Sequence, residues 1–504
     1  SLSYNIRGWL TGIESQHFSQ TLHYVDGVGV PCYNGNISSM TWHSGSEAGL
    51  RGYKFTYDGF SRLKDAIYGE GEQLSNNLNR FNEQVTGYDK NGNILGLLRY
   101  GQTNTMSYGL IDNLNLVYNG NQLESVNDNA TGHVFGNGME FKDGASKEIE
   151  YEYDVNGNLT KDLNKKIADI QYNCLNLPEK VQFEGGNSIS YLYAADGTKL
   201  RTTYKTGNAT TITDYCGNAI YENGVLIKVL TEDGYITVSN NQFHYFIQDH
   251  QGNNRVVVAQ NGTVEEVNDY YPFGGLLSSS LSNNVQPYKY NGKELNRDNG
   301  LDWYDYGARM YDASLGRWHM MDPMAEKYYT INSYVYCINN PVGYIDPNGL
   351  WAQSSLGWFT DNTKDIGRFL NMMQIEIEMQ GNISKDQLNN FIYAEYKGIG
   401  GRLSDGSTLL SEVNAVLDKI RGWDILEYQK KAMLNEIDEY TSFVQNDYIQ
   451  QVAGLSGDWK HFVGPSLIFL GQPIRALKPI GALGSKPGSS IASYTLSKAF
   501  PQRF

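Results

Sequence analysis

Two aspartates near the middle of the chain each stand immediately before a proline, and they are the residues best suited to perform chemistry. Asp322 lies in Arg-Trp-His-Met-Met-Asp-Pro, and Asp346 lies in Asp-Pro-Asn-Gly-Leu. Two carboxyl groups that come close repel each other's charge, so one holds a proton near neutral pH while the other acts as a base. Such a pair can act on a peptide bond, whereas one carboxylate cannot play both roles.

The local sequence leaves other roles open for these residues. Each following proline fixes its own φ and biases the Asp toward an extended conformation, which is compatible with strands that fold back on one another. Asp before Pro also frequently caps a turn. Arg317 could hold one carboxylate through its planar guanidinium, or it could be a packing residue stacked on a Tyr.

The elements that must position these groups are expected to be β-strands. The chain has 504 residues, of which 38 are Tyr and 54 are Gly, and only 19% are charged. This composition favours strands and turns over helices or disorder. The length allows several domains, although repetition can build one large unit from many small ones.

Charge and cysteine content argue against several classes of function. The formal net charge of -15 argues against broad nucleic-acid binding, which needs a surplus of Lys and Arg. No cofactor and no metal site are predicted, because the cysteines lack zinc-binding or disulfide-framework spacing. We expect them to be small buried residues: Cys32, Cys174, Cys216 and Cys337.

One phrase recurs along the first part of the chain. It contains Tyr-Asp or an aromatic pair, then a turn such as Asn-Gly-Asn, then an apolar residue. Asn-Gly and Asp-Gly tolerate the positive φ of tight hairpin turns, and the Asp can accept hydrogen bonds from turn amides. A lone hairpin is marginal in water, so many must pair into a continuous sheet. Examples are 55–59, 88–94, 118–123, 151–159 and 191–200.

These phrases resemble YD repeats, and residues 304–350 resemble the Rhs repeat-associated core domain. The segments 244–255 and 269–274 are similar to the phrase that precedes this core in the same family. The resemblance covers roughly residues 1–350. It implies a mainly β fold in which an antiparallel YD-repeat sheet spirals into a hollow shell, at residues 1–240, closed by the core at 241–350.

The resemblance also implies a reaction. Related Rhs and Tc-toxin C components cut themselves after Asp-Pro-x-Gly-Leu with a pair of aspartates. The matching catalytic positions are Asp322 and Asp346, with Arg317 as a candidate partner, and the expected cut lies between Leu350 and Trp351.

The sequence changes character after Leu350. Capping and helical periodicity predict a small α-helical segment over residues 351–458. Residues 459–504 form a basic tail rich in Gly, Pro and Ser, for which membrane contact is one interpretation and a flexible tail the other. The first residues read as the middle of a strand-rich domain, so an export signal would lie upstream.

These features favour a secreted or cell-surface toxin-delivery shell of the polymorphic toxin class, acting in competition between bacteria. Its expected partners are its own C-terminal segment as cargo, a secretion apparatus and an immunity protein. Two alternatives remain: a non-catalytic adhesion or carbohydrate-binding protein, for which exposed Tyr would supply stacking surfaces, and a membrane-active C-terminal effector.

Overall fold

The computed structural model describes residues 1–5, 9–45, 49–278, 286–326, 331–350, 352–354, 358–360 and 461–463. The chain divides into two compact units, one of Ser1–Ser3 with Thr11–Ala352 and one of Tyr4–Leu10 with Gln353–Arg503. Within the described ranges, no helix has the length and apolar character needed to cross a membrane.

The first sheet takes its strands in sequence order and pairs neighbours antiparallel. Side chains on a strand alternate between its two faces, so every second residue of β3 is buried, namely Phe18, Gln20 and Leu22. The strands are β1 (Leu2–Tyr4), β2 (Leu10–Glu14), β3 (Phe18–His23), β4 (Ser39–Ser44), β5 (Arg51–Tyr57), β6 (Leu63–Glu70), β7 (Glu83–Tyr88), β8 (Ile94–Gln102), β9 (Tyr108–Asn119) and β10 (Gln122–Asp128).

The second sheet follows the same rule and continues to Val267, past residue 240. Its strands are β11 (Tyr151–Tyr153), β12 (Leu159–Asp162), β13 (Ile167–Tyr172), β14 (Pro178–Phe183), β15 (Ser188–Tyr193), β16 (Lys199–Thr206), β17 (Ala209–Cys216), β18 (Ala219–Glu222), β19 (Val225–Thr231), β20 (Gly234–Thr237), β21 (Gln242–Gln248), β22 (Asn254–Ala259) and β23 (Val264–Val267). The 3₁₀ turn η1 (Glu184–Gly186) lies between β14 and β15. The prediction of a mainly antiparallel β fold is therefore confirmed.

The turns of the repeated phrase explain its composition. In the turn between β7 and β8, Gly92 has φ of 85°, a conformation that L side chains rarely adopt. The Asp89 carboxylate accepts hydrogen bonds from the amides of Asn91 at 2.9 Å and Asn93 at 2.7 Å. The predicted role of Asp in accepting turn amides is thus confirmed.

The Tyr residues of the phrase join successive hairpins. The hydroxyl of Tyr88 donates to the carbonyl of Leu63 at 2.6 Å, and that of Tyr118 donates to the carbonyl of Ile94 at 2.8 Å. Each of these hydrogen bonds connects a hairpin to the one that precedes it in the sequence. The polar tip of a partly buried ring thereby sets the spacing of neighbouring repeats.

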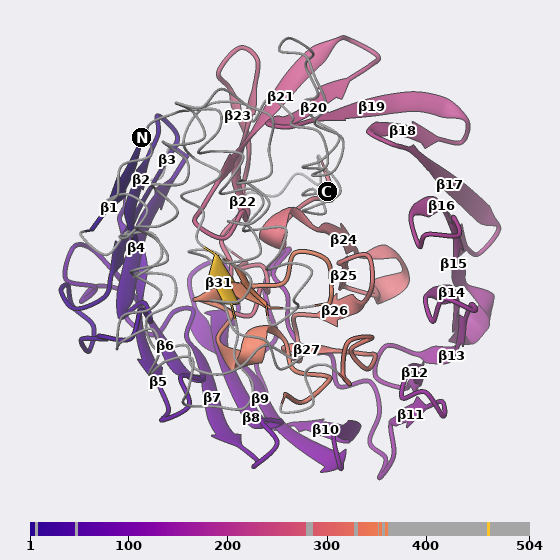
Figure 1. Cartoon of the computed structure of the whole chain (residues 1–504), viewed down its shortest axis with the longest axis horizontal. Coiled ribbons are helices and arrows are strands. Elements are labelled where there is room, and N and C mark those ends of the chain that lie inside the picture. Colours follow the sequence, from indigo (N-terminus) through magenta and orange to yellow (C-terminus); the bar gives the residue numbers. More distant parts are fainter. Residues whose placement is uncertain are drawn as a thin grey trace, which may run out of the picture. The chain divides into compact units, whose positions relative to one another are not determined.

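A third, smaller sheet contains β24 (Glu294–Asn296), β25 (Trp303–Asp305), β26 (Met310–Asp312) and β27 (Arg317–Trp318), accompanied by the 3₁₀ turns η2 (Tyr290–Gly292), η3 (Asp298–Gly300) and η4 (Cys337–Asn339). In Figure 1, the strands of the first two sheets follow one another around the first unit, and β24 to β27 lie on the inner side of that curve. An aromatic cluster fills this inner region, with Tyr311 and Tyr336 stacked at 4.0 Å between ring centroids.

A buried arginine ties the small sheet to the first sheet. Arg99 of β8 pairs with Glu83 at 2.6 Å and Asp112 at 3.0 Å, and it also donates to the carbonyls of Ala313 and Ser314 at 2.8 and 2.6 Å. Every partner of this guanidinium is buried. The residues after β26 are therefore fixed in position by a strand far earlier in the chain.

Residues next to strands of the second sheet contact the first sheet through polar groups. Arg51 of β5 pairs with Asp269 at 2.6 Å, and the Trp42 indole donates to the same carboxylate at 2.8 Å. His250 contacts Gln20 of β3 at 3.2 Å. The chain thus winds back to its first strands just before the small sheet begins.

The second unit contains β30 (Trp358–Thr360) paired antiparallel with β31 (His461–Val463). A further short strand, β29 (Gln353–Ser354), follows Ala352. The helices predicted over 351–458 and the basic tail predicted over 459–504 otherwise lie outside the described residues.

The cysteine prediction was only partly right. Cys337 is buried and Cys32 is partly buried, but Cys174 and Cys216 are exposed. Cys174 lies in the turn after β13, and Cys216 ends β17 at a hairpin, so both stand at the ends of strands.

Candidate active site

The loop Asp346–Leu350 folds around the side chain of its own first residue. Asp346 follows the short strand β28 (Tyr344–Ile345). Its Oδ1 accepts hydrogen bonds from the amides of Asn348 at 3.1 Å, Gly349 at 2.7 Å and Leu350 at 3.2 Å. Three amide donors on one oxygen favour its ionised form. The same bonds bring the carboxylate within one residue of the predicted cut.

Arg309, directly before β26, joins the two aspartates. Its Nη2 lies 2.9 Å from Oδ2 of Asp322 and 3.3 Å from Oδ2 of Asp346. Its Nε donates to the carbonyl of Gly349 at 2.5 Å, and Nη1 donates to the carbonyl of Ser333 at 3.1 Å. The planar fork of an arginine suits this set of acceptors, because each nitrogen has a fixed direction.

The two carboxyl groups differ in their exposure to water. The Asp322 side chain is 15% exposed and that of Asp346 is 3% exposed. Oδ1 of Asp322 accepts one amide, from Met324 at 2.8 Å. Asp322 is thus the more accessible member of the pair to water, and Asp346 accepts more hydrogen bonds from backbone amides.

Burial is the main cause of the pKa shift at both positions. It raises the pKa of Asp346 above its ordinary value, against the opposing effect of the Arg309 cation and the loop amides. Burial also raises the pKa of Asp322, and the nearby charge of Asp346 raises it further. Two carboxyl groups coupled in this way titrate as a pair that retains a proton at higher pH than free carboxyl groups do.

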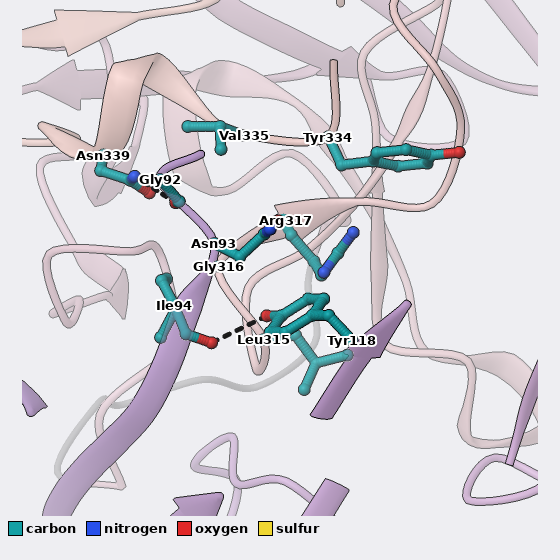
Figure 2. Close-up of a pocket in the computed structure, with 10 residues that line it drawn as sticks. All are labelled: Gly92, Asn93, Ile94, Tyr118, Leu315, Gly316, Arg317, Tyr334, Val335 and Asn339. Atoms are coloured by element: carbon teal, nitrogen blue, oxygen red, sulfur yellow. Dashed lines mark hydrogen bonds between the residues drawn. The ribbon is translucent and has the colours of Figure 1, made fainter. Parts of the chain in front are cut away.

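The structure brings Asp322, Asp346 and Leu350 together, whereas Trp351 lies outside the described residues. Arg317 takes the packing role that the sequence left open. Its guanidinium lies over the rings of Tyr118 and Tyr334, 5.0 and 5.2 Å from their centroids. It donates to the carbonyl of Asn121 at 2.8 Å. Figure 2 shows Arg317 in the small pocket that it lines with both tyrosines.

Arg309 is not among the site residues predicted from the sequence. The alternation of side chains between the two faces of a strand could have indicated it. Tyr311 pairs with Trp318, and Asp312 pairs with Arg317, so these two pairs point to opposite faces of the small sheet. The Arg309 guanidinium lies 4.2 Å from the Trp318 ring centroid. Arg309 therefore shares the face of Trp318, and Arg317 points away from it.

His319 also packs rather than joining the pair. Its ring lies 4.2 Å from that of Trp303, and its Nε2 is 3.5 Å from Oδ2 of Asp312. Burial lowers the pKa of His319. His319 is therefore a buried residue that packs on Trp303.

No protein-family model matches the sequence. Three curated proteins are similar to parts of it. Salivary gland surface protein 1 of Aedes aegypti is 30% identical over 223 residues, covering 39% of this chain and 6% of that protein. Toxin subunit YenC2 of Yersinia entomophaga is 33% identical over 111 residues, covering 21% and 11%. The tRNA3(Ser)-specific nuclease WapA of Bacillus spizizenii is 24% identical over 316 residues, covering 59% and 11%. The chain spans only a small part of each relative.

Solved structures of Tc toxins are also similar to this chain. The crystal structure of TcdB2-TccC3-TEV has 17% sequence identity and a TM-score of 0.47, covering 69% of this chain and 19% of that one. The Photorhabdus luminescens Tc holotoxin pore gives the same identity, coverage and TM-score.

Proposed function

We propose that this chain is part of a toxin-delivery shell that cuts itself between Leu350 and Trp351. The observation that carries the proposal is the contact of Asp322 and Asp346 with one nitrogen of Arg309, in a loop where Asp346 also binds the Leu350 amide. This arrangement supplies two carboxyl groups of unequal environment beside the bond to be cut.

Asp346 is the member that starts ionised, because three amides and Arg309 donate to it. Its charge favours a proton on Asp322. A water molecule adds through oxygen to the carbonyl carbon of Leu350, and Asp346 takes the proton that the water loses. Asp322 gives its proton to the nitrogen of Trp351 as the C–N bond breaks. The products are a carboxyl group at Leu350 and an amine at Trp351, so the reaction consumes one water.

The residues after Leu350 are the proposed cargo, and the repeat sheets with their inner small sheet are the proposed enclosing shell. The names of two relatives, a toxin subunit and a nuclease, support delivery of a toxic segment. A secretion apparatus, an immunity protein, a location outside the cell and a role in competition between bacteria belong to the same proposal.

The mass of the purified chain tests the proposal. We expect two fragments, one ending at Leu350 and one beginning at Trp351, and a single uncut chain for Asp322→Asn and for Asp346→Asn. Asp196→Asn is the matched control, since the exposed Asp196 serves only a turn, where it accepts the Thr198 amide at 3.0 Å. A fragment beginning at Trp351 in either active-site variant would refute the mechanism.

A second candidate function is surface adhesion without cleavage, which the salivary gland surface protein favours as a relative. The aromatic side chains of Tyr33 and Phe60 are well exposed and could stack on a sugar. An intact chain that binds a glycan array, with binding lost in Tyr33→Ala or Phe60→Ala, would favour this candidate over the first.

A further inference from the structure

We infer that Lys293 is a positioning residue for the self-cleavage, an inference that rests on the proposed function. Lys293 follows η2, and its Nζ donates to the carbonyl of Pro347 at 2.7 Å. Pro347 is the residue between Asp346 and the rest of the cleavage loop. The lysine is only 5% exposed, and its Nζ lies 5.4 Å from the Tyr306 ring centroid.

The contact acts on Asp346 through one peptide group. The carbonyl of Pro347 accepts from Lys293, and the N–H of the same peptide, on Asn348, donates to Oδ1 of Asp346 at 3.1 Å. A hydrogen bond at one end of a peptide group polarises it and strengthens the bond at the other end. Lys293 therefore strengthens a donor that holds Asp346 ionised, and it does not need to touch the reacting bond.

Two other carbonyls of the loop have partners from elsewhere in the chain. The carbonyl of Asn348 accepts from the amide of Ala308 at 3.2 Å, and that of Gly349 accepts from Arg309. Lys293 is the donor to the carbonyl of Pro347, which precedes these two in the loop. Its own backbone is fixed, because its amide donates to Tyr290 at 2.9 Å and its carbonyl accepts from Lys289 at 2.9 Å.

The positive charge of Lys293 favours the ionised form of Asp346, as does its hydrogen bond to Pro347. Burial lowers the pKa of Lys293, while the charges of Asp346 and Asp305 oppose that shift. Because the interaction is mutual, the ammonium opposes the rise that burial causes in the pKa of Asp346. The other ionisable groups that act with Asp346 are Arg309, Asp322, the Cys337 thiol and the Tyr306 phenol.

Three substitutions separate positioning from simple structural support. Lys293→Met removes donor and charge, Lys293→Gln keeps a donor without charge, and Lys293→Arg keeps both. We expect Lys293→Met to slow cleavage about tenfold or more and to move the acidic limb of the pH–rate profile to higher pH. Lys293→Gln should show a smaller pH shift and a smaller loss of rate than Lys293→Met, and Lys293→Arg should restore the profile. Lys161→Met, which removes a partly exposed lysine paired with Glu152, is the control.

The results distinguish this inference from the proposed function. A parent chain that remains intact would refute the proposed function and the inference with it. If the parent chain is cut and Lys293→Met is cut with the same rate and pH profile, only the role of Lys293 is refuted. A slower Lys293→Met variant with an unshifted profile and a lowered unfolding midpoint would reduce Lys293 to a structural residue. If Lys293→Met does not fold, Lys293→Gln provides the test. A shifted pH profile in Lys293→Gln would support the positioning role, and an unshifted profile would refute it.

Discussion

Asp322 and Asp346 lie against the same nitrogen of Arg309, at 2.9 and 3.3 Å. One cation between two carboxyl groups offsets the repulsion that would otherwise separate them. It leaves them unequal, because Asp346 is bound by three loop amides and Asp322 by one amide of its own turn. In the proposed mechanism, this inequality assigns Asp346 to take a proton and Asp322 to give one.

Replacing Arg309 with Lys should damage both the reaction and the fold. A single ammonium cannot replace the contacts to both aspartates and to the carbonyls of Gly349 and Ser333. We expect cleavage to slow about 100-fold and the free energy of unfolding to fall by about 3 kcal/mol, the cost of breaking a buried pair. Cleavage time courses and urea unfolding measure the two effects. Arg317→Lys should keep the cut, and an equal loss there would return the catalytic role to Arg317.

Gly349→Ala should slow cleavage by a steric route. Gly349 has φ of 77°, and a Cβ added to it would meet the backbone nitrogen of Arg309 at 2.9 Å. Gly300 has a similar φ of 78° but open space around its missing side chain, so Gly300→Ala is the matched control. Both variants carry a left-handed strain of about 1 kcal/mol. Only Gly349→Ala should lose cleavage, and equal rates for the two variants would contradict this account of the loop.

The rate of cleavage should depend on pH as expected for a pair that must hold one proton. Burial raises the pKa of both Asp322 and Asp346, so the singly protonated state should persist above about pH 4, where free carboxyl groups ionise. We expect a bell-shaped profile whose maximum lies above that value. A pH-jump experiment followed by quantification of the fragments gives the profile. A rate independent of pH would show that this pair does not perform the reaction.

Arg99→Met should detach the small sheet from the first sheet. The change leaves Glu83 and Asp112 buried without their cation and removes two donors to the carbonyls after β26. We expect a loss of about 3–5 kcal/mol in the free energy of unfolding. The measurement is denaturant unfolding in an Asp346→Asn background, which keeps the chain uncut. Arg201→Met removes an exposed arginine paired with Asp214 and should leave the unfolding midpoint nearly unchanged.

Asp162→Asn should stabilise the protein at neutral pH. Burial raises the pKa of Asp162 to about 6, although the Lys165 cation opposes the shift. Because the folded pKa exceeds the unfolded one, the contribution to stability is full below about pH 4 and is lost as pH rises through 6. The variant should therefore exceed the parent by up to about 3 kcal/mol at pH 8 and lose that advantage at pH 4. A constant difference across this range in thermal melts would contradict the assignment.

The local parts of the fold could be predicted from the sequence, and the long-range parts could not. Asp89 and Gly92 specify their hairpin within five residues, so the turn signal is complete in the sequence. The contact of Arg309 with Asp322 and Asp346 depends on how the small sheet is paired and on the path of the chain after β27. Arg309 and Arg317 look equivalent in sequence. The pairing of β26 with β27 distinguishes them, because it puts neighbouring residues on opposite faces.

The ion pair between Arg51 and Asp269 joins positions 218 apart in the sequence. A ribosome must therefore add most of two sheets before the early strands can acquire this partner, and the entropy of so large a loop delays the contact further. Asp346 emerges later still and reaches its place only on the completed scaffold. The order of synthesis would therefore make the proposed cut one of the last events in the maturation of the chain.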